Sequence, residues 1–177
     1  DPPPFPQTAQ RFYFLADAPR FFAVDCVVAS EAGVEPFLER ERHGEPLVYF
    51  DRTSSIRARP VDRPALAARR ARRWDQLRGA VPVFAMLVNK ELARGRPLEA
   101  LGFYQGLLRA LLEVLGIEHR PDRFDFNWRY VETQLPEEAR ALLARYAFVA
   151  DEQALRERAP RLAEELRRRL DAGVPPA

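Results

Sequence analysis

Apolar and polar positions alternate along the first part of the chain with the two-residue period of β-strands. Phe12 and Phe14 alternate with polar neighbours and predict a short strand that ends at a turn near Pro19. Residues 21–28, FFAVDCVV, form a second apolar run, and residues 46–51, PLVYFD, form a third. Three short strands are too little sheet to fold alone, so we expect them to be part of a larger sheet.

The remaining sequence has mostly the spacing of amphipathic helices. We expect helices over 31–42, from a cap at Asp62 to 94, over 97–116, from Pro136 to about 147, and from a cap at Asp151 to about 170. Pro82 either kinks the helix that begins at Asp62 or starts a second one. The leucines from Leu98 onward form a wide apolar stripe, so the helix over 97–116 is expected to be central and buried.

These elements predict an α+β fold, in which a partial mixed sheet is followed by an antiparallel helical bundle. The expected division is an α/β region over 1–60 and a helical-bundle domain over 61–177. Residues 117–135 between two of the helices are expected to form a loop.

Composition narrows the classes of protein to consider. The chain has 177 residues, of which 47% are hydrophobic, and this supports a buried core and excludes wholesale disorder. A single cysteine, Cys26, excludes an internal disulfide framework and is expected to be buried and inert. No apolar run approaches the length of a membrane span and no secretory signal pattern is seen, so we expect a cytoplasmic protein without a membrane partner.

Arginine carries almost all of the positive charge. The chain has 28 Lys and Arg residues, and Lys90 is the only lysine. Arginines crowd residues 52–78 and favour either a solvated helix face or a phosphate-binding surface. Trp74 lies among them, which leaves nucleic-acid contact open. Residues 120–130 combine charge with aromatic rings and fit either a ligand-binding loop or a lid that ties helices together.

Asp25 is the first candidate for chemistry. A carboxylate within an apolar strand is costly unless it is hydrogen-bonded, paired or bound to metal. The strand period puts Asp25 on the same face as Ala23 and Val27. The alternatives are an edge-strand carboxylate that faces water, an ion pair with an arginine such as Arg20, and a ligand for Mg²⁺. One carboxylate is not a two-metal site, and Asp51 is better explained by a turn.

Lys90 and Arg94 lie one helical turn apart on the same face. Their spacing suits a clamp on a polyphosphate, and the alternative is a surface lysine beside Glu91. His43 and His119 have no partner at ligand spacing, so we treat both as structural.

The order of these elements resembles a known family. The strand that carries Asp25 is followed by a helix that ends at Glu41-Arg42-His43-Gly44 and by the strand Pro46–Arg52. The helical half then contains Val88-Asn89-Lys90, Arg94-Gly95, Tyr104 and Arg123-Phe124-Asp125. In this order they resemble bacterial nucleotidyltransferase-domain proteins of the DNA polymerase β superfamily, and are most similar to relatives of the aminoglycoside nucleotidyltransferases.

The resemblance implies a nucleotidyltransferase-like sheet and an activity. Such a protein moves a nucleoside monophosphate from a nucleoside triphosphate to a hydroxyl acceptor, which is an aminoglycoside-like small molecule or another compound. The implied cofactor is Mg²⁺, and Asp25 is the implied catalytic and metal-binding carboxylate. Lys90, Arg94 and Tyr104 are implied to contact the nucleotide.

The chain departs from this family upstream of Asp25. The resemblance places a Gly-Ser turn and an acid-x-acid pair before that strand, and residues 1–24 contain neither. We therefore expect the enzyme to be incomplete or inactive in this form. The alternatives are a non-catalytic interaction or antitoxin-like module and a nucleic-acid-binding helical protein, although nucleic acid is not the expected partner. Half a sheet with an apolar edge also predicts a homodimer.

Overall fold

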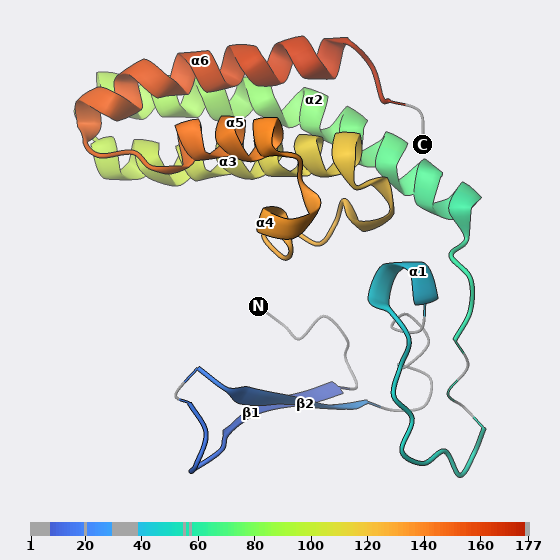
Figure 1. The fold of residues 1–177 in the computed structure, drawn as a ribbon. Coiled ribbons are helices and arrows are strands. Elements are labelled where there is room, and N and C mark those ends of the chain that lie inside the picture. Colours follow the sequence, from blue (N-terminus) through green and yellow to red (C-terminus); the bar gives the residue numbers. More distant parts are fainter. Residues whose placement is uncertain (1–7, 20, 30–38, 55, 57, 176–177) are drawn as a thin grey trace. The chain divides into compact units, whose positions relative to one another are not determined.

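A computed structural model describes residues 8–19, 21–29, 39–54, 56 and 58–175. The chain divides into two compact units, Asp1–Val61 and Asp62–Ala177. The division expected between residues 60 and 61 lies beside this boundary. The described residues make an α+β protein, with a two-stranded antiparallel sheet in the first unit and most of the helices in the second (Figure 1).

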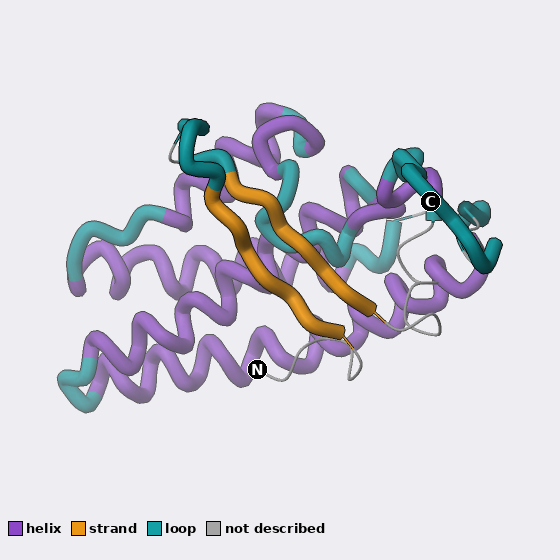
Figure 2. The backbone as a smooth tube through the Cα atoms, turned by 90° about the horizontal axis from the view of Figure 1, so that it is seen from below, coloured by secondary structure: helices purple, strands orange, loops and turns teal. Residues whose placement is uncertain are grey.

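The sheet of the first unit pairs β1 (Thr8–Phe14) with β2 (Ala23–Ala29). Figure 2 shows the two strands side by side, and their register sets Phe12 opposite Asp25. The third strand predicted over 46–51 is wrong, because these residues are irregular and expose their side chains. An apolar run favours a strand, but a strand also needs a neighbour for its backbone groups, and no described residue pairs with 46–51. The sheet is therefore antiparallel rather than mixed.

Large apolar side chains of the hairpin are exposed on both of its faces. Phe14 is 72% exposed on one face, and Tyr13 is 50% exposed on the other. Cys26 is also exposed, so the expectation of a buried thiol is wrong. The reason is that a two-stranded sheet supplies no second layer of its own to cover a strand residue, and such a hairpin is marginal by itself.

The short helix α1 (Arg40–His43) follows β2 in the first unit. Gly44 ends it with a φ of 86°, a conformation that favours glycine, as expected for a helix C-terminus. Most of the helix predicted over 31–42 lies outside the described residues.

The second unit begins with α2 (Arg63–Ala93). Asp62 caps it by accepting a hydrogen bond of 3.0 Å from the backbone N–H of Ala65, as predicted. The helix continues through Pro82, which settles the choice between one interrupted helix and two. Proline has no N–H, so the carbonyl of Arg78 loses its helical donor. Gly95, with a φ of 70°, follows the helix end.

Helix α3 (Pro97–His119) is the centre of the second unit and packs against α2, α5 (Glu137–Ala147) and α6 (Glu152–Asp171) (Figure 1). Its fully buried side chains include Leu107, Leu111, Leu112, Val114 and Leu115. Leu98 is 80% exposed, so the predicted stripe begins too early. Ala100 in the same first turn is fully buried, so Leu98 is exposed because it lies on the outward side of this turn.

The predicted helices over 136–147 and 151–170 are confirmed by α5 and α6, and Asp151 caps α6 by accepting from the Ala154 N–H at 2.7 Å. The segment 117–135 contains more structure than the expected loop. The last turn of α3, the 3₁₀ turn η3 (Pro121–Arg123) and the short helix α4 (Val131–Gln134) all fall within it.

Helix α3 is also long and apolar enough, by length and composition, to cross a membrane. The expectation that no run approaches that length is therefore wrong. Most of this apolar window is buried inside the second unit, as in the core helix of a water-soluble protein.

Candidate functional site

Asp25 presents its carboxylate from the middle of β2. Both carboxylate oxygens accept hydrogen bonds from the side-chain Nε2 of Gln10 on β1, at 2.8 and 3.0 Å. Gln10 stands opposite Val27 in the register, so it reaches Asp25 diagonally across the hairpin. Asp25 is exposed. The alternative partner Arg20 lies outside the described residues.

Lys90 and Arg94 meet at a third side chain, Glu91. Lys90 Nζ lies 3.0 Å from Glu91 Oε1, and Arg94 Nη1 lies 3.3 Å from the same oxygen. Arg96 Nη1 lies 3.8 Å from Glu91 Oε2. The Glu91 side chain is only 6% exposed, and the hydrogen bond from Lys90 lowers the pKa of this carboxyl below its ordinary value. The two predicted phosphate-binding cations are therefore held together by one carboxylate that stays ionised.

Tyr104 lies in the core of the second unit and is 1% exposed. Its hydroxyl donates a hydrogen bond of 2.8 Å to the backbone carbonyl of Tyr146 on α5. Burial raises the pKa of Tyr104 to about 12. In this arrangement a nucleotide reaches the Tyr104 hydroxyl only if the packing of α3 against α5 opens.

The described residues do not fit a complete magnesium site. Among them, no three His, Cys, Asp or Glu side chains come together in a group that would hold a metal ion. Mg²⁺ is commonly held by one or two carboxylates together with substrate phosphates and water, so Asp25 suits one ligand position and leaves the others unfilled. We therefore assign no reaction step through the metal.

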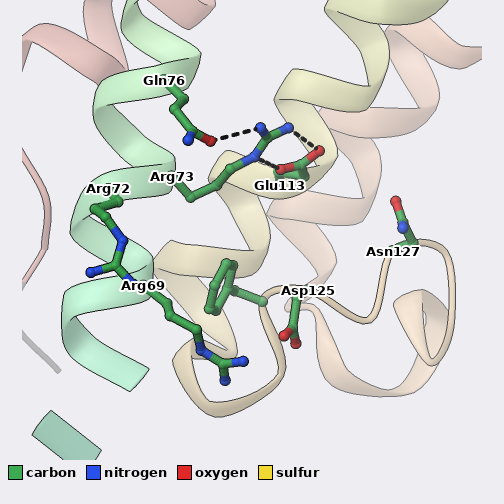
Figure 3. Close-up of a pocket in the computed structure, with 8 residues that line it drawn as sticks. Arg69, Arg72, Arg73, Gln76, Glu113, Asp125 and Asn127 are labelled. Carbon is green, nitrogen blue, oxygen red and sulfur yellow. Dashed lines mark hydrogen bonds and ion pairs between the residues drawn. The ribbon is translucent and has the colours of Figure 1, made fainter. Parts of the chain in front are cut away.

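A cavity of about 310 Å³ in the second unit brings together two segments that lie far apart in the sequence. The arginine-rich stretch supplies one wall and the aromatic segment 120–130 supplies another (Figure 3). We call it the arginine cavity, and it is lined by Arg69, Arg72, Arg73, Gln76, Glu113, Phe124, Asp125 and Asn127. Sequence reasoning missed this site, although the α2 residues among them lie at positions i, i+3, i+4 and i+7 and so share one helical face.

The wall of the arginine cavity contains a two-pronged ion pair between α2 and α3. Arg73 Nε donates to Glu113 Oε2 at 2.5 Å, and Arg73 Nη2 donates to Glu113 Oε1 at 2.9 Å. Its third nitrogen, Nη1, donates to Gln76 Oε1 at 3.1 Å (Figure 3). The hydrogen bond with Glu113 raises the pKa of Arg73. Arg73 is therefore held in place, and its positive charge is balanced by Glu113.

Trp74 does not face a ligand. It is 1% exposed, and its indole N–H donates to the carbonyl of Leu170 at 3.1 Å. The nucleic-acid contact that the sequence left open at Trp74 finds no support here, because Trp74 lies on the core-facing side of α2.

No known family model, characterised protein or solved structure matches this chain. Function therefore has to follow from the residues and their geometry.

Proposed function

We propose that the protein takes part in nucleotidyl transfer, the movement of a nucleoside monophosphate from a nucleoside triphosphate to a hydroxyl acceptor. In this proposal the described chain binds the triphosphate and supplies one of the metal-binding carboxylates. The observation that carries the proposal is the exposed carboxylate of Asp25, which stands alone in an apolar strand and is oriented by Gln10.

The position and orientation of the Asp25 carboxylate suit a metal ligand. A strand is a rigid support, and one side-chain amide holds both oxygens without neutralising their charge. Each carboxylate oxygen has two lone pairs, so lone pairs remain for a hard cation. When bound, Mg²⁺ would neutralise charge on the triphosphate and polarise its phosphorus–oxygen bonds.

The cluster at the end of α2 supports triphosphate binding. Lys90, Arg94 and Arg96 surround a single carboxylate, Glu91, so three positive charges meet one negative charge and two remain in excess. Lys90 and Arg94 keep 39% and 54% of their side chains exposed. An ammonium and a guanidinium that are fixed on one side and open on the other can donate further hydrogen bonds to phosphate oxygens.

Calorimetric titration of ATP and GTP, with and without Mg²⁺, tests the proposal. We expect Asp25→Asn to abolish the Mg²⁺-dependent part of the affinity, whereas Asp17→Asn, in an exposed turn of the same unit, leaves it unchanged. We expect Lys90→Ala to weaken binding about tenfold, since a charge-assisted hydrogen bond to phosphate is lost. Lys90→Arg is not expected to restore it. A folded protein that binds neither nucleotide in the presence of Mg²⁺ would refute the proposal.

A second candidate is a non-catalytic interaction module, and the apolar hairpin favours it. Phe12, Phe14 and Val28 each expose more than half of their surface, and exposed apolar patches often mark protein–protein contacts. This candidate predicts a stable complex with a co-purifying protein and no effect of Asp25→Asn on that complex.

A further inference from the structure

Four arginines fall within five positions of α2, and the structure gives them different surroundings. Arg70 is buried, and Arg73 is paired with Glu113. Arg69 and Arg72 are exposed on the arginine cavity, and neither makes an ion pair with a carboxylate in the part of the chain that the structure describes. Like charges one helical turn apart repel, so an anion between these two guanidinium groups would relieve an unfavourable interaction.

The negative charges on the cavity wall are already engaged. Glu113 is neutralised by the two-pronged pair with Arg73. Asp125 interacts with Arg120, where burial lowers the pKa of the guanidinium and Asp125 opposes that shift. Three arginines and two carboxylates line the cavity, so one positive charge is left in excess there.

A neutral donor stands beside them. The side-chain oxygen of Gln76 accepts from Arg73, so the amide NH₂ of Gln76 is turned away from that bond (Figure 3). Two planar guanidinium groups and an amide follow one another along one face of α2, so they present N–H donors to a chain of phosphate groups. The volume of about 310 Å³ is at the lower end of the range for small-molecule sites.

The loop that forms the opposite wall is held in a fixed shape. The buried Arg120 donates hydrogen bonds to the carbonyls of Asn127 and Arg129. Asn127 and Tyr130 have φ angles of 51° and 60°, in the left-handed region that costs energy for residues other than glycine. Such conformations persist only where the surroundings fix them, so this wall loses little freedom when a ligand binds.

We propose that the arginine cavity binds the phosphate groups of a small polyphosphate through Arg69, Arg72 and Gln76. The site is distinct from the cluster at Lys90, which lies about 25 Å further along α2 at the helical rise per residue. The inference therefore does not depend on Asp25 or Lys90. The polyphosphate has two sources, the phosphate chain of a nucleotide or free pyrophosphate.

Calorimetry of the full Lys90→Ala chain without Mg²⁺, with pyrophosphate and ATP as separate ligands, tests this site after the cluster at Lys90 has been weakened. We expect the double variant Arg69→Gln/Arg72→Gln to lower the affinity for both ligands by at least about tenfold, since two charge-assisted contacts are lost. The matched control is Arg109→Gln/Arg145→Gln, which removes the same charge from exposed arginines on α3 and α5 that have no ion pair among the described residues. The control is expected to change affinity by less than about twofold, because distant charges are screened by salt.

The outcomes separate the ligand sources. Equal affinities for pyrophosphate and ATP support a free polyphosphate, and tighter binding of ATP supports a nucleotide. The proposal is overturned if neither ligand binds the folded protein, if the control loses as much affinity as the cavity variant, or if only a single-stranded oligonucleotide binds. Asp25→Asn and Lys90→Ala should leave pyrophosphate binding here intact, so failure of this site and failure of the nucleotidyl-transfer proposal give different results.

Discussion

The hydrogen bond from the Tyr104 hydroxyl to the Tyr146 carbonyl allows a direct test of what Tyr104 does. Tyr146 lies in the last turn of α5, where backbone carbonyls have no donor within the helix. Both residues are buried, with exposed fractions of 1% and 6%. Tyr104→Phe keeps the ring and removes the only donor given to that carbonyl by the described residues.

The expected loss follows from the buried carbonyl that is left behind. An unpaired buried acceptor costs about 1–3 kcal/mol. For a unit of this size, a loss of 1 kcal/mol lowers Tm by about 4 °C, so Tyr104→Phe should lower it by about 4–12 °C. Thermal unfolding followed by circular dichroism measures this. The control is Tyr130→Phe, which is 54% exposed and is expected to change the free energy of unfolding by less than about 0.5 kcal/mol.

The pH dependence of stability gives the same residue a second readout. Burial raises the pKa of Tyr104 from 10.0 to about 12. The folded state therefore holds this proton more tightly than the unfolded state, and the contribution is complete below pH 10 and is lost as the pH rises toward 12. Urea unfolding across this window should show a loss in the wild-type protein that is smaller in Tyr104→Phe.

One result would contradict this reasoning. If Tyr104→Phe unfolds at the wild-type temperature and binds ATP more weakly, the hydroxyl contacts the nucleotide, as the family resemblance implies, and the buried hydrogen bond contributes nothing measurable.

Five further substitutions test the packing and pairing of the second unit. Gly102→Ala should stabilise α3 by up to about 1 kcal/mol in urea unfolding, because nothing lies within 4 Å of the added methyl group. Gly106→Ala should stabilise it less, since its methyl group would lie 2.7 Å from the Phe84 ring. In a Phe84→Ala background the two glycine substitutions should have the same effect. Leu166→Ala should cost about 2–5 kcal/mol in urea unfolding, because this side chain is fully buried, and a loss below 1 kcal/mol would contradict the packing. Glu113→Ala should cost about 1 kcal/mol, since its arginine partner is 40% exposed, and a double-mutant cycle isolates the pair.

The helices of the second unit could be predicted because their signals are local. Asp62 and Asp151 cap the N-termini of α2 and α6 with their side chains. Gly95 follows the end of α2 in a left-handed conformation that glycine adopts without strain. These features depend on a few neighbouring residues, so one sequence is enough to find them.

The sheet could be predicted only in part because pairing is not local. Residues 46–51 have the composition of a strand, yet they lack a described partner. Cys26 alternates correctly in its strand, but whether its face is covered depends on a second layer that the alternation does not reveal. Leu98 shows the same limit in a helix, since its spacing fits the stripe but no neighbouring element covers its side chain.

The sequence predicted which residue types line the candidate sites, but not how these residues are arranged in space. The sequence shows that Lys90 and Arg94 share a helical face, but not that Glu91 is buried between them. Likewise the sequence shows the arginines of α2 but not that the loop at Asn127 faces them, because the facing residues lie some forty or more positions later in the chain. Long-range juxtaposition is the part that a single sequence does not contain.

The ion pair between Lys90 and Glu91 has a practical consequence. Because the sequence contains one lysine, an amine-selective acylating reagent has one side-chain target, and that target is 39% exposed. Acylation removes the ammonium charge and leaves the carboxylate to its two guanidinium neighbours. The rate of labelling, read by intact mass, therefore reports directly on how often this single contact opens, and any ligand that covers it will register as protection.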